Sequence, residues 1–143
     1  PEKIPAGALC HHRTCTYDFM PSILDYLGMN DQIPSRTPGC SYAPALRGQT
    51  IDWDNTIFHE FENARMIRTD GWKYTWRHPE GPDELYDMTT DPGERHNLVG
   101  NPRVEATIQE LRARIDAFYT QYADPEFDLW KGGRSKAGRA VEF

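Results

Sequence analysis

The chain has 143 residues, the length of one ordinary domain, and its 16 basic and 22 acidic residues give a net charge of −6. This acidic balance argues against binding nucleic acid or an anionic membrane by bulk electrostatics, because both need clustered positive charge. No apolar run approaches the roughly 18 residues of a membrane-spanning helix. The three cysteines, an odd and low number, exclude a disulfide-built scaffold and leave the compartment, and so the localisation, open.

The first fifty residues predict one amphipathic helix between loops. Apolar residues recur at spacings of three and four from Tyr17 onward, with Asp18 as a start signal and Pro21 in the first turn. Gly28 closes the helix, since it tolerates the positive φ found just past a helix end. A connector with two prolines follows, and a short turn of helix is expected over 42–48.

The middle of the chain predicts a small antiparallel sheet. Residues 56–62 alternate in polarity, as in a strand. The dipeptide Asp70-Gly71 favours a two-residue type I′ hairpin, in which Ile67 faces Tyr74 and the aromatic residues of the second strand share the core side with Ile67. A further short strand is expected over 84–87.

The hairpin register also places two basic residues, Arg68 and Lys73, directly opposite each other on the other face. Like charges at such positions repel. We therefore expect an acidic side chain, Glu60 or Glu62, beside this pair.

Two helix starts follow the sheet. Asp91-Pro92-Gly93-Glu94 has the pattern of a capping box and predicts a brief helical turn. Asn101-Pro102 opens the longest helix, which should end near Asp124-Pro125. Its expected buried stripe consists of Val104, Ile108, Leu111, Ile115, Phe118 and Tyr122.

Two groups of residues suggest chemistry, each with a plainer alternative. Cys10, His11, His12 and Cys15 include zinc-type ligands, but the spacing is not a standard one and no second ligand pair follows, so ordinary loop residues are favoured. His59 and Glu60 could form an acid–base pair, yet adjacent strand residues point to opposite faces. A packed His59 beside a solvated Glu60 is the favoured interpretation.

The sequence shows no nucleophile elbow, no glycine-rich phosphate loop and no zinc-protease motif. From the residues alone, the chain is an α+β module without a complete active site.

Four stretches, in order, resemble the C-terminal part of sulfatases of the alkaline phosphatase superfamily. They are residues 1–7 (PEKIPAG), 18–28 (DFMPSILDYLG), 45–48 (ALRG), and a run over 66–98. The last is the most specific, because MIRTDGWKY leads to ELYD and then to DPGERHNL. Two positions depart from the family pattern, where Glu2 replaces a glycine and Ser22 a threonine. The resemblance extends to about Asp124.

The resemblance implies that residues 1–50 are the end of a large α/β domain, 51–124 a C-terminal subdomain, and 125–143 a tail. The implied fold is α+β: a small antiparallel sheet of three to four strands packed against a long C-terminal helix, preceded by a helical segment from the end of the large domain. An exposed apolar patch is then expected near residues 8–28, where the large domain would pack.

The resemblance also implies a reaction centre outside this stretch. The family's nucleophile is a formylglycine made in a C/S-x-P-x-R motif, which this chain lacks. The ligands of the divalent cation, normally calcium, lie upstream in such enzymes. We therefore assign no catalytic residue, metal ligand or cofactor to this chain, and expect the 143 residues alone not to hydrolyse an aryl sulfate.

In the family, loops of the subdomain lie beside the active-site mouth and help to select the substrate. By position, His59, Glu60, Asn63 and Arg65 are the candidate substrate-binding residues. Arg65 has the strongest physical argument among them, because a guanidinium can form two parallel hydrogen bonds to a sulfate or carboxylate. The alternative is a surface turn that touches nothing.

The implied function is that of the non-catalytic end of a sulfuric ester hydrolase acting on a sulfated sugar or aryl sulfate, with the upstream catalytic domain as its partner. A phosphodiesterase or phosphonate monoester hydrolase of the same superfamily is a close variant. A free-standing binding module that shares the fold is the remaining alternative. Self-association of the isolated chain would fit the exposed patch, and neither nucleic acid nor membrane is expected as a partner.

Overall fold

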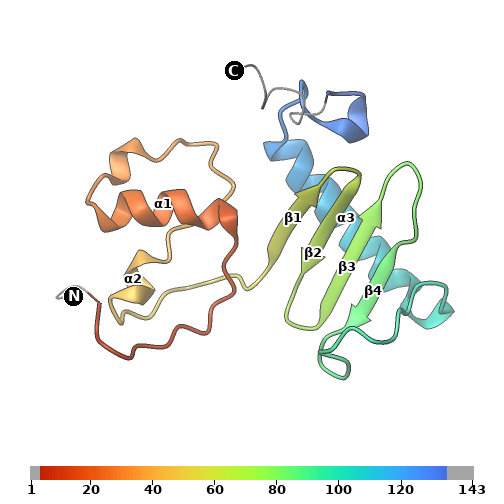
Figure 1. The fold of residues 1–143 in the computed structure, drawn as a ribbon, viewed down its shortest axis with the longest axis horizontal. Coiled ribbons are helices and arrows are strands. Elements are labelled where there is room, and N and C mark those ends of the chain that lie inside the picture. Colours follow the sequence, from red (N-terminus) through yellow and green to blue (C-terminus); the bar gives the residue numbers. More distant parts are fainter. Residues whose placement is uncertain (1–3, 135–143) are drawn as a thin grey trace, which may run out of the picture. The chain divides into compact units, whose positions relative to one another are not determined.

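A computed structural model describes residues 4–134, and the chain forms two compact units (Figure 1). The N-terminal unit is Pro1–Ile57 and the C-terminal unit is Phe58–Phe143. Within the described residues, no helix is both long enough and apolar enough to cross a membrane.

The N-terminal unit is built around α1 (Thr16–Tyr26), which begins before the predicted start signal. Asp18 lies inside the first turn, and its carboxylate accepts the N–H of Cys15, the residue that precedes the helix, at 2.8 Å. Pro21 lies inside the helix rather than in its first turn, and has no N–H to donate to the Tyr17 carbonyl. The chain at Gly39 approaches that carbonyl so closely that a Cβ there would lie 2.1 Å from the oxygen.

The end of α1 confirms the prediction for Gly28. Its φ is +79°, and its N–H donates to the Asp25 carbonyl while that of Met29 reaches back to Leu24. The short helix expected over 42–48 is α2 (Ala43–Leu46), and the connector before it contains a single 3₁₀ turn, η1 (Asn30–Gln32).

Polar side chains of α1 hold the connector against the helix. The Cys40 N–H donates to Asp18 (2.9 Å) and the Tyr42 N–H to the Ser22 hydroxyl (3.0 Å). Asp25 accepts from the Ser41 hydroxyl (2.6 Å) and from the Arg47 guanidinium (3.1 Å). The hydrogen bond from Ser41, with the Arg47 charge, lowers the pKa of Asp25. The side of α1 that meets the connector is therefore polar.

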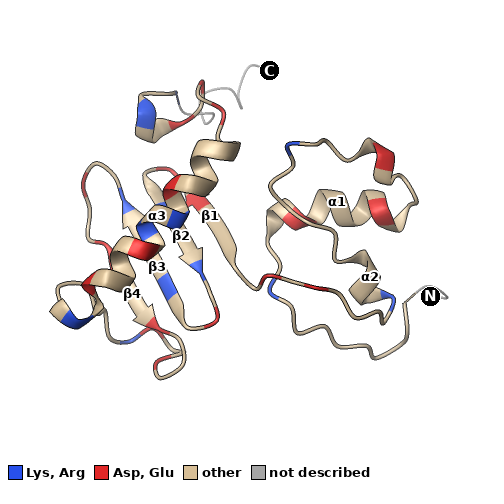
Figure 2. Cartoon of the chain, turned by 180° about the vertical axis from the view of Figure 1, so that it is seen from behind, with Lys and Arg blue, Asp and Glu red and all other residues tan. Residues whose placement is uncertain are grey.

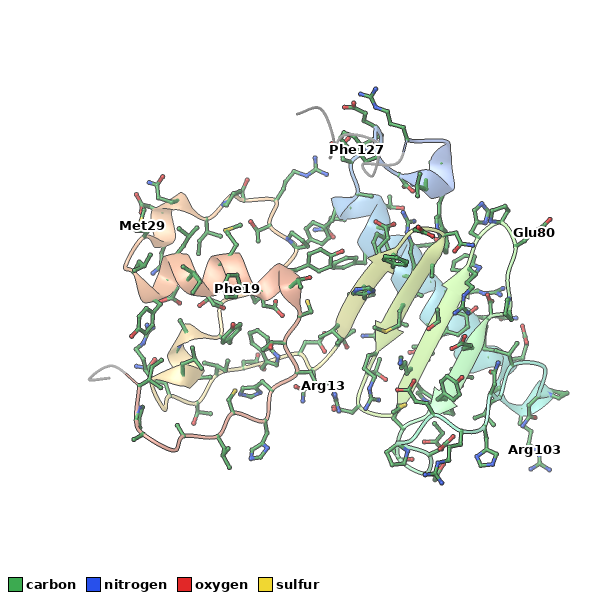
Figure 3. All side chains as sticks on the ribbon, viewed as in Figure 1. Arg13, Phe19, Met29, Glu80, Arg103 and Phe127 are labelled. Carbon is green, nitrogen blue, oxygen red and sulfur yellow. The ribbon has the colours of Figure 1, made fainter. Side chains whose placement is uncertain are left out.

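The apolar side chains of α1 and its flanks are exposed instead. Phe19 is 60% and Leu27 61% exposed, and the others are Leu9, Met20, Ile23 and Met29. Figure 3 labels two of them, Phe19 on α1 and Met29 just beyond it. Leu9, Phe19, Met20, Ile23 and Leu27 are thus exposed within residues 8–28, where an apolar patch was predicted.

The C-terminal unit contains a four-stranded antiparallel sheet in the order β1-β2-β3-β4. The strands are β1 (Ile57–Phe61), β2 (Ala64–Arg68), β3 (Trp72–Arg77) and β4 (Glu84–Asp87). In the β2–β3 hairpin Ile67 pairs with Tyr74 and Arg68 with Lys73, which confirms the predicted register.

The turn type of this hairpin was predicted wrongly. A type I′ turn needs positive φ at both central residues, and neither Asp70 nor Gly71 has it. The Thr69 hydroxyl instead accepts the Trp72 N–H at 3.0 Å and so helps to close the turn. Positive φ occurs at Glu62, in the turn between β1 and β2.

The long helix α3 (Glu105–Tyr122) covers one face of the sheet, as the opposite views of Figures 1 and 2 show. It follows a 3₁₀ turn, η2 (Pro102–Val104), at which the Asn101 side chain accepts the Arg103 N–H, so the predicted start is confirmed. The core consists of Ile67, Tyr74, Leu85, Val104, Ile108, Leu111, Ile115 and Tyr119.

The last turn of α3 differs from the predicted stripe. Tyr119 is buried there, whereas Tyr122 is only partly covered. The predicted positions average 3.6 residues per turn, as in a straight helix, so the difference is confined to the last turn, where the buried residue after Ile115 follows it by four positions (Tyr119) and not by three (Phe118). On β1 the core side is that of Phe58, whose ring stacks on Phe118 at 4.0 Å between centroids.

Two predictions that concern the loop after β4 are wrong. Residues 91–94 form a turn and not a helix, with the Asp91 carboxylate accepting the N–H groups of Arg95 and His96. Glu94 has a φ of +55° and pairs with Lys73 at 2.6 Å. The acidic partner of Lys73 is therefore Glu94 and not Glu60 or Glu62, and Glu60 pairs with Arg65 instead.

Candidate functional site

The β1–β2 region holds all four candidate substrate-binding residues, and Arg65 is the most enclosed of them. It lies on the core side of β2 and is 2% exposed. Its Nε donates to Glu60 Oε1 at 2.7 Å, and its Nη2 donates to Asp128 Oδ1 at 2.6 Å. The guanidinium thus bridges a carboxylate on β1 and a carboxylate that follows α3.

Two aromatic rings enclose the same guanidinium. Its central carbon lies 4.1 Å from the centre of the Tyr119 ring and 4.5 Å from that of the Trp130 ring. Such cation–π contacts are worth more when the cation is desolvated, as it is here. We call these five residues the Arg65 clamp: Glu60, Arg65, Tyr119, Asp128 and Trp130.

Asp128 is held by its own segment. Its carboxylate accepts the Trp130 N–H at 3.0 Å and caps the 3₁₀ turn η3 (Leu129–Lys131). Gly133 returns so close to it that an added Cβ would lie 2.5 Å from the Asp128 nitrogen. The 125–134 part of the predicted tail is therefore a folded element, and the rest of the tail lies outside the described residues.

The clamp determines what the guanidinium can do. The two-point pairing expected with a sulfate or carboxylate of a ligand is made here with Glu60 and Asp128 of the chain itself. Arg65 therefore fixes the position of Glu60, whose side chain keeps 33% of its surface exposed. The geometry favours a positioning role for Arg65 over direct contact with a ligand.

The other candidates are more open. His59 points to the face of β1 opposite Glu60 and is exposed, so the expected packed His59 is wrong, whereas Glu60 is exposed as expected although it pairs with Arg65. Asn63 lies exposed in the β1–β2 turn, and its amide donates to the Glu80 carbonyl at 3.2 Å. The structure brings Glu60 and Arg65 together but leaves His59 and Asn63 apart from them.

A second polar network lies between β3 and α3. The Tyr74 hydroxyl donates to Asp83 at 2.7 Å, and Arg112 donates to both groups at 2.7 and 2.8 Å. Burial, with the hydrogen bond to Asp83, raises the pKa of Tyr74. All three groups are satisfied by one another, which is typical of a structural network.

We predicted no metal ligand in this chain, and the arrangement of its possible ligand side chains can be compared with that prediction. Among residues 4–134, no three His, Cys, Asp or Glu side chains are grouped so that they could bind a metal ion. Cys10, His11, His12 and Cys15 are therefore not grouped there as a zinc site.

Comparison with known proteins now identifies the family. Residues 1–121 match the family described as N-sulphoglucosamine sulphohydrolase, C-terminal. A delta 4,5-hexuronate-2-O-sulfatase of Bacteroides thetaiotaomicron is 33% identical over 118 residues, which are 76% of this chain and 24% of that protein. The chain spans about a quarter of the length of the curated relatives it matches.

Solved structures agree in fold. A protein solved in complex with its substrate D-glucosamine-2-N,6-O-disulfate is 26% identical, with a TM-score of 0.69 over 90% of this chain and 28% of the other. A phosphonate monoester hydrolase from Silicibacter pomeroyi is 23% identical, with a TM-score of 0.64 over 78% of this chain and 26% of the other, and shows the shared fold alone. The chain belongs to the N-sulphoglucosamine sulphohydrolase C-terminal family, and is a C-terminal region of a sulfatase of the alkaline phosphatase superfamily.

Proposed function

We propose that this chain works as the non-catalytic C-terminal region of a sulfuric ester hydrolase that acts on sulfated sugars. The observation that carries the proposal is the family match over residues 1–121. The sugar is suggested by the relatives, one being a hexuronate-2-O-sulfatase and another having been solved with a disulfated glucosamine. The reaction would add water across the ester, releasing the sugar hydroxyl, inorganic sulfate and a proton.

The chemical step is proposed to depend on residues outside this chain. No C/S-x-P-x-R motif occurs in the sequence, and no metal-binding group occurs in residues 4–134. The formylglycine nucleophile and the calcium ion are accordingly proposed for the catalytic domain, the partner of this chain in the same protein. When bound, the cation would stabilise negative charge on the sulfate oxygens.

The part proposed for this chain is recognition of the sugar at the β1–β2 region. With the Arg65 guanidinium committed to its two carboxylates, the exposed groups there are the His59 imidazole, the Glu60 carboxylate and the Asn63 amide. A carboxylate and an amide accept hydrogen bonds from hydroxyls, whereas a carboxylate would repel a sulfate. We therefore assign these groups to sugar hydroxyls and not to the sulfate itself.

The test uses the complete open reading frame that encodes these residues. Sulfate release is measured from a 2-O-sulfated hexuronate, a 6-O-sulfated glucosamine and an aryl sulfate, with a phosphonate monoester as the competing substrate. We expect release from at least one sulfated sugar to exceed cleavage of the phosphonate. Faster cleavage of the phosphonate than of any sulfated sugar would favour the second candidate function, a phosphonate monoester hydrolase, which only the shared fold supports. No hydrolysis at all would favour a binding module.

Variants then separate the sugar contacts from the chemistry. Asn63→Ala should raise KM about tenfold while changing kcat little, because a hydrogen bond used equally in ground and transition states affects only binding. Arg103→Ala is the matched control, since Arg103 is exposed on η2 and projects away from the sheet (Figure 3). An unchanged KM in the Asn63 variant would contradict the assigned position of the sugar.

A further inference from the structure

Two cysteines of the N-terminal unit meet at one carboxylate. The Cys15 N–H donates to Asp18 Oδ2 at 2.8 Å, and the Cys40 N–H donates to the other oxygen of the same group, Oδ1, at 2.9 Å. Because one small group accepts both bonds, the backbones of Cys15 and Cys40 are neighbours although they are far apart in sequence.

The surrounding contacts fix this arrangement. Asp18 is buried, and the Ser22 hydroxyl donates to its carbonyl at 2.6 Å while accepting the Tyr42 N–H at 3.0 Å. At Gly39, directly before Cys40, a Cβ would lie 2.6 Å from the Asp18 nitrogen. The connector therefore runs in close contact with the first turns of α1.

The Cys15 thiol lies at this contact between the connector and the first turns of α1. It lies against the N–H groups of Tyr17 and Asp18 at the start of α1, and Gly39 adjoins the second of these. Cys15 is half-buried, whereas Cys40 is exposed to any reagent in solution. Burial also raises the pKa of the Cys15 thiol, so Cys40 is the thiol that a reagent meets first.

We propose that Cys15 and Cys40 are a modification site that accepts a disulfide, joining the start of α1 to the connector. Disulfides span Cα atoms about 4.4–6.8 Å apart, a spacing within reach of two residues whose amides share a carboxylate. The proposal does not depend on the proposed enzymatic function.

The step needs a disulfide oxidant, for which oxidised glutathione serves. The Cys40 thiolate attacks one sulfur of the oxidant, and a glutathione thiolate leaves. The Cys15 thiolate then attacks the Cys40 sulfur and displaces the second glutathione. The two cysteine thiols are oxidised to one disulfide, the oxidant is reduced to two glutathione molecules, and the two protons pass to them.

Cys10 makes the proposal sharply testable. It is exposed, like Cys40, and it is close to Cys15 in sequence. In an unfolded chain the shortest loop closes most readily, so Cys10–Cys15 should be the main pair. In the folded chain we expect the opposite preference, with Cys15–Cys40 as the main disulfide.

The experiment oxidises the full 143-residue chain with oxidised glutathione, once in buffer and once in guanidinium, and then alkylates and digests it with trypsin without reduction. Cleavage at lysine and arginine separates the cysteines onto peptides 4–13, 14–36 and 37–47. In buffer we expect peptides 14–36 and 37–47 to be joined, two hydrogens lighter than their sum, in about tenfold excess over crosslinks to 4–13.

Variants complete the test. Cys10→Ser should keep the crosslink, and Cys40→Ser should remove it. A native chain that gives mainly the Cys10–Cys15 crosslink, or no crosslink within one chain, overturns the proposal. Circular dichroism checks that each sample is folded, and where a variant is not, the comparison of the unmutated chain in buffer and in guanidinium still decides.

Discussion

In the C-terminal unit an apolar core joins the sheet to α3, whereas in the N-terminal unit half of the buried side chains are polar. The core of the C-terminal unit contains aliphatic and aromatic side chains from three strands and from the whole length of α3. In the described part of the N-terminal unit, the buried residues are Asp18, Pro21, Ser22 and Ala43. Its larger apolar side chains, such as Phe19 and Leu27, are exposed.

The difference shows that two kinds of contact keep the two units in shape. Apolar burial is the main driving force of folding, at roughly 25 cal/mol per Å², so the C-terminal unit has its own source of stability. The N-terminal unit relies on hydrogen bonds, whose net contribution is about 1 kcal/mol each. A unit of this kind, with its apolar residues outward, fits the proposal that it is the end of a larger domain.

The largest effect should come from breaking the Arg65 clamp. Arg65→Ala would leave the buried Asp128 carboxylate without its cation, which typically costs about 3–5 kcal/mol of unfolding free energy. Urea unfolding followed by tryptophan fluorescence measures the loss. Arg103→Ala is the control and should change the free energy by less than about 0.5 kcal/mol. Equal effects of the two substitutions would show that the clamp contributes no stability.

A pair of leucine truncations tests the comparison of the units directly. Leu111 is buried in the core, and Leu111→Ala should cost about 2–5 kcal/mol, since it removes buried methyl groups and leaves a cavity. Leu27→Ala, on the exposed flank of α1, should change the unfolding free energy by less than about 0.5 kcal/mol. The same urea titration compares them, and a large loss for Leu27 would mean that its side chain is covered in solution.

A smaller effect is expected at the polar centre of the N-terminal unit. Asp18→Asn leaves one oxygen where two now accept the N–H groups of Cys15 and Cys40, so one partly buried donor loses its partner at a cost of about 1 kcal/mol. Proteolysis between α1 and α2 should become faster. Unchanged proteolysis would mean that the carboxylate does not hold the connector.

The smallest effect should appear as a dependence on pH in the C-terminal unit. Burial pushes the pKa of Asp83 upward, but hydrogen bonds from the Arg77 N–H, Tyr74 and Arg112 outweigh it and hold the pKa below its usual value. A carboxyl whose pKa is lower in the folded state contributes its stability above about pH 4, the range of the unfolded value, and loses it as the pH falls through the folded value.

The check compares the unmutated chain with Asp83→Asn by urea unfolding at pH 7 and at pH 3. At pH 7 the unmutated chain should have a clearly larger free energy of unfolding than the Asp83→Asn variant, and this difference should become smaller at pH 3. An advantage of the same size at both pH values would contradict the lowered pKa.

Features set by neighbouring residues could be predicted from the sequence. The register of the hairpin, the Gly28 helix end and the start at Asn101 of the helical segment that leads into α3 all depend on local preferences, and all three are confirmed. The turn at Asp70-Gly71 and the turn after Asp91 show where local preference fails. At the first turn the Met88 N–H donates to the Gly71 carbonyl at 2.8 Å, and at the second Glu94 pairs with Lys73 on β3.

The candidate site was only partly predictable for a related reason. Arg65 and Glu60 were recognised from their position in a familiar pattern, but Asp128 is 63 residues away from Arg65 in sequence. No periodicity links such a pair, and residues 125–143 were predicted only as a tail. An aspartate two residues before a tryptophan, after a helix end, was the one available signal for a capped and packed turn.

Hydrogen exchange on the 143-residue chain tests most directly whether the C-terminal unit alone carries a core. The amides of β2, β3 and α3 should exchange slowest, at rates that report global unfolding, and those of α1 should exchange much faster because local opening exposes them. Protection of α1 equal to that of α3 would contradict the contrast between the two units.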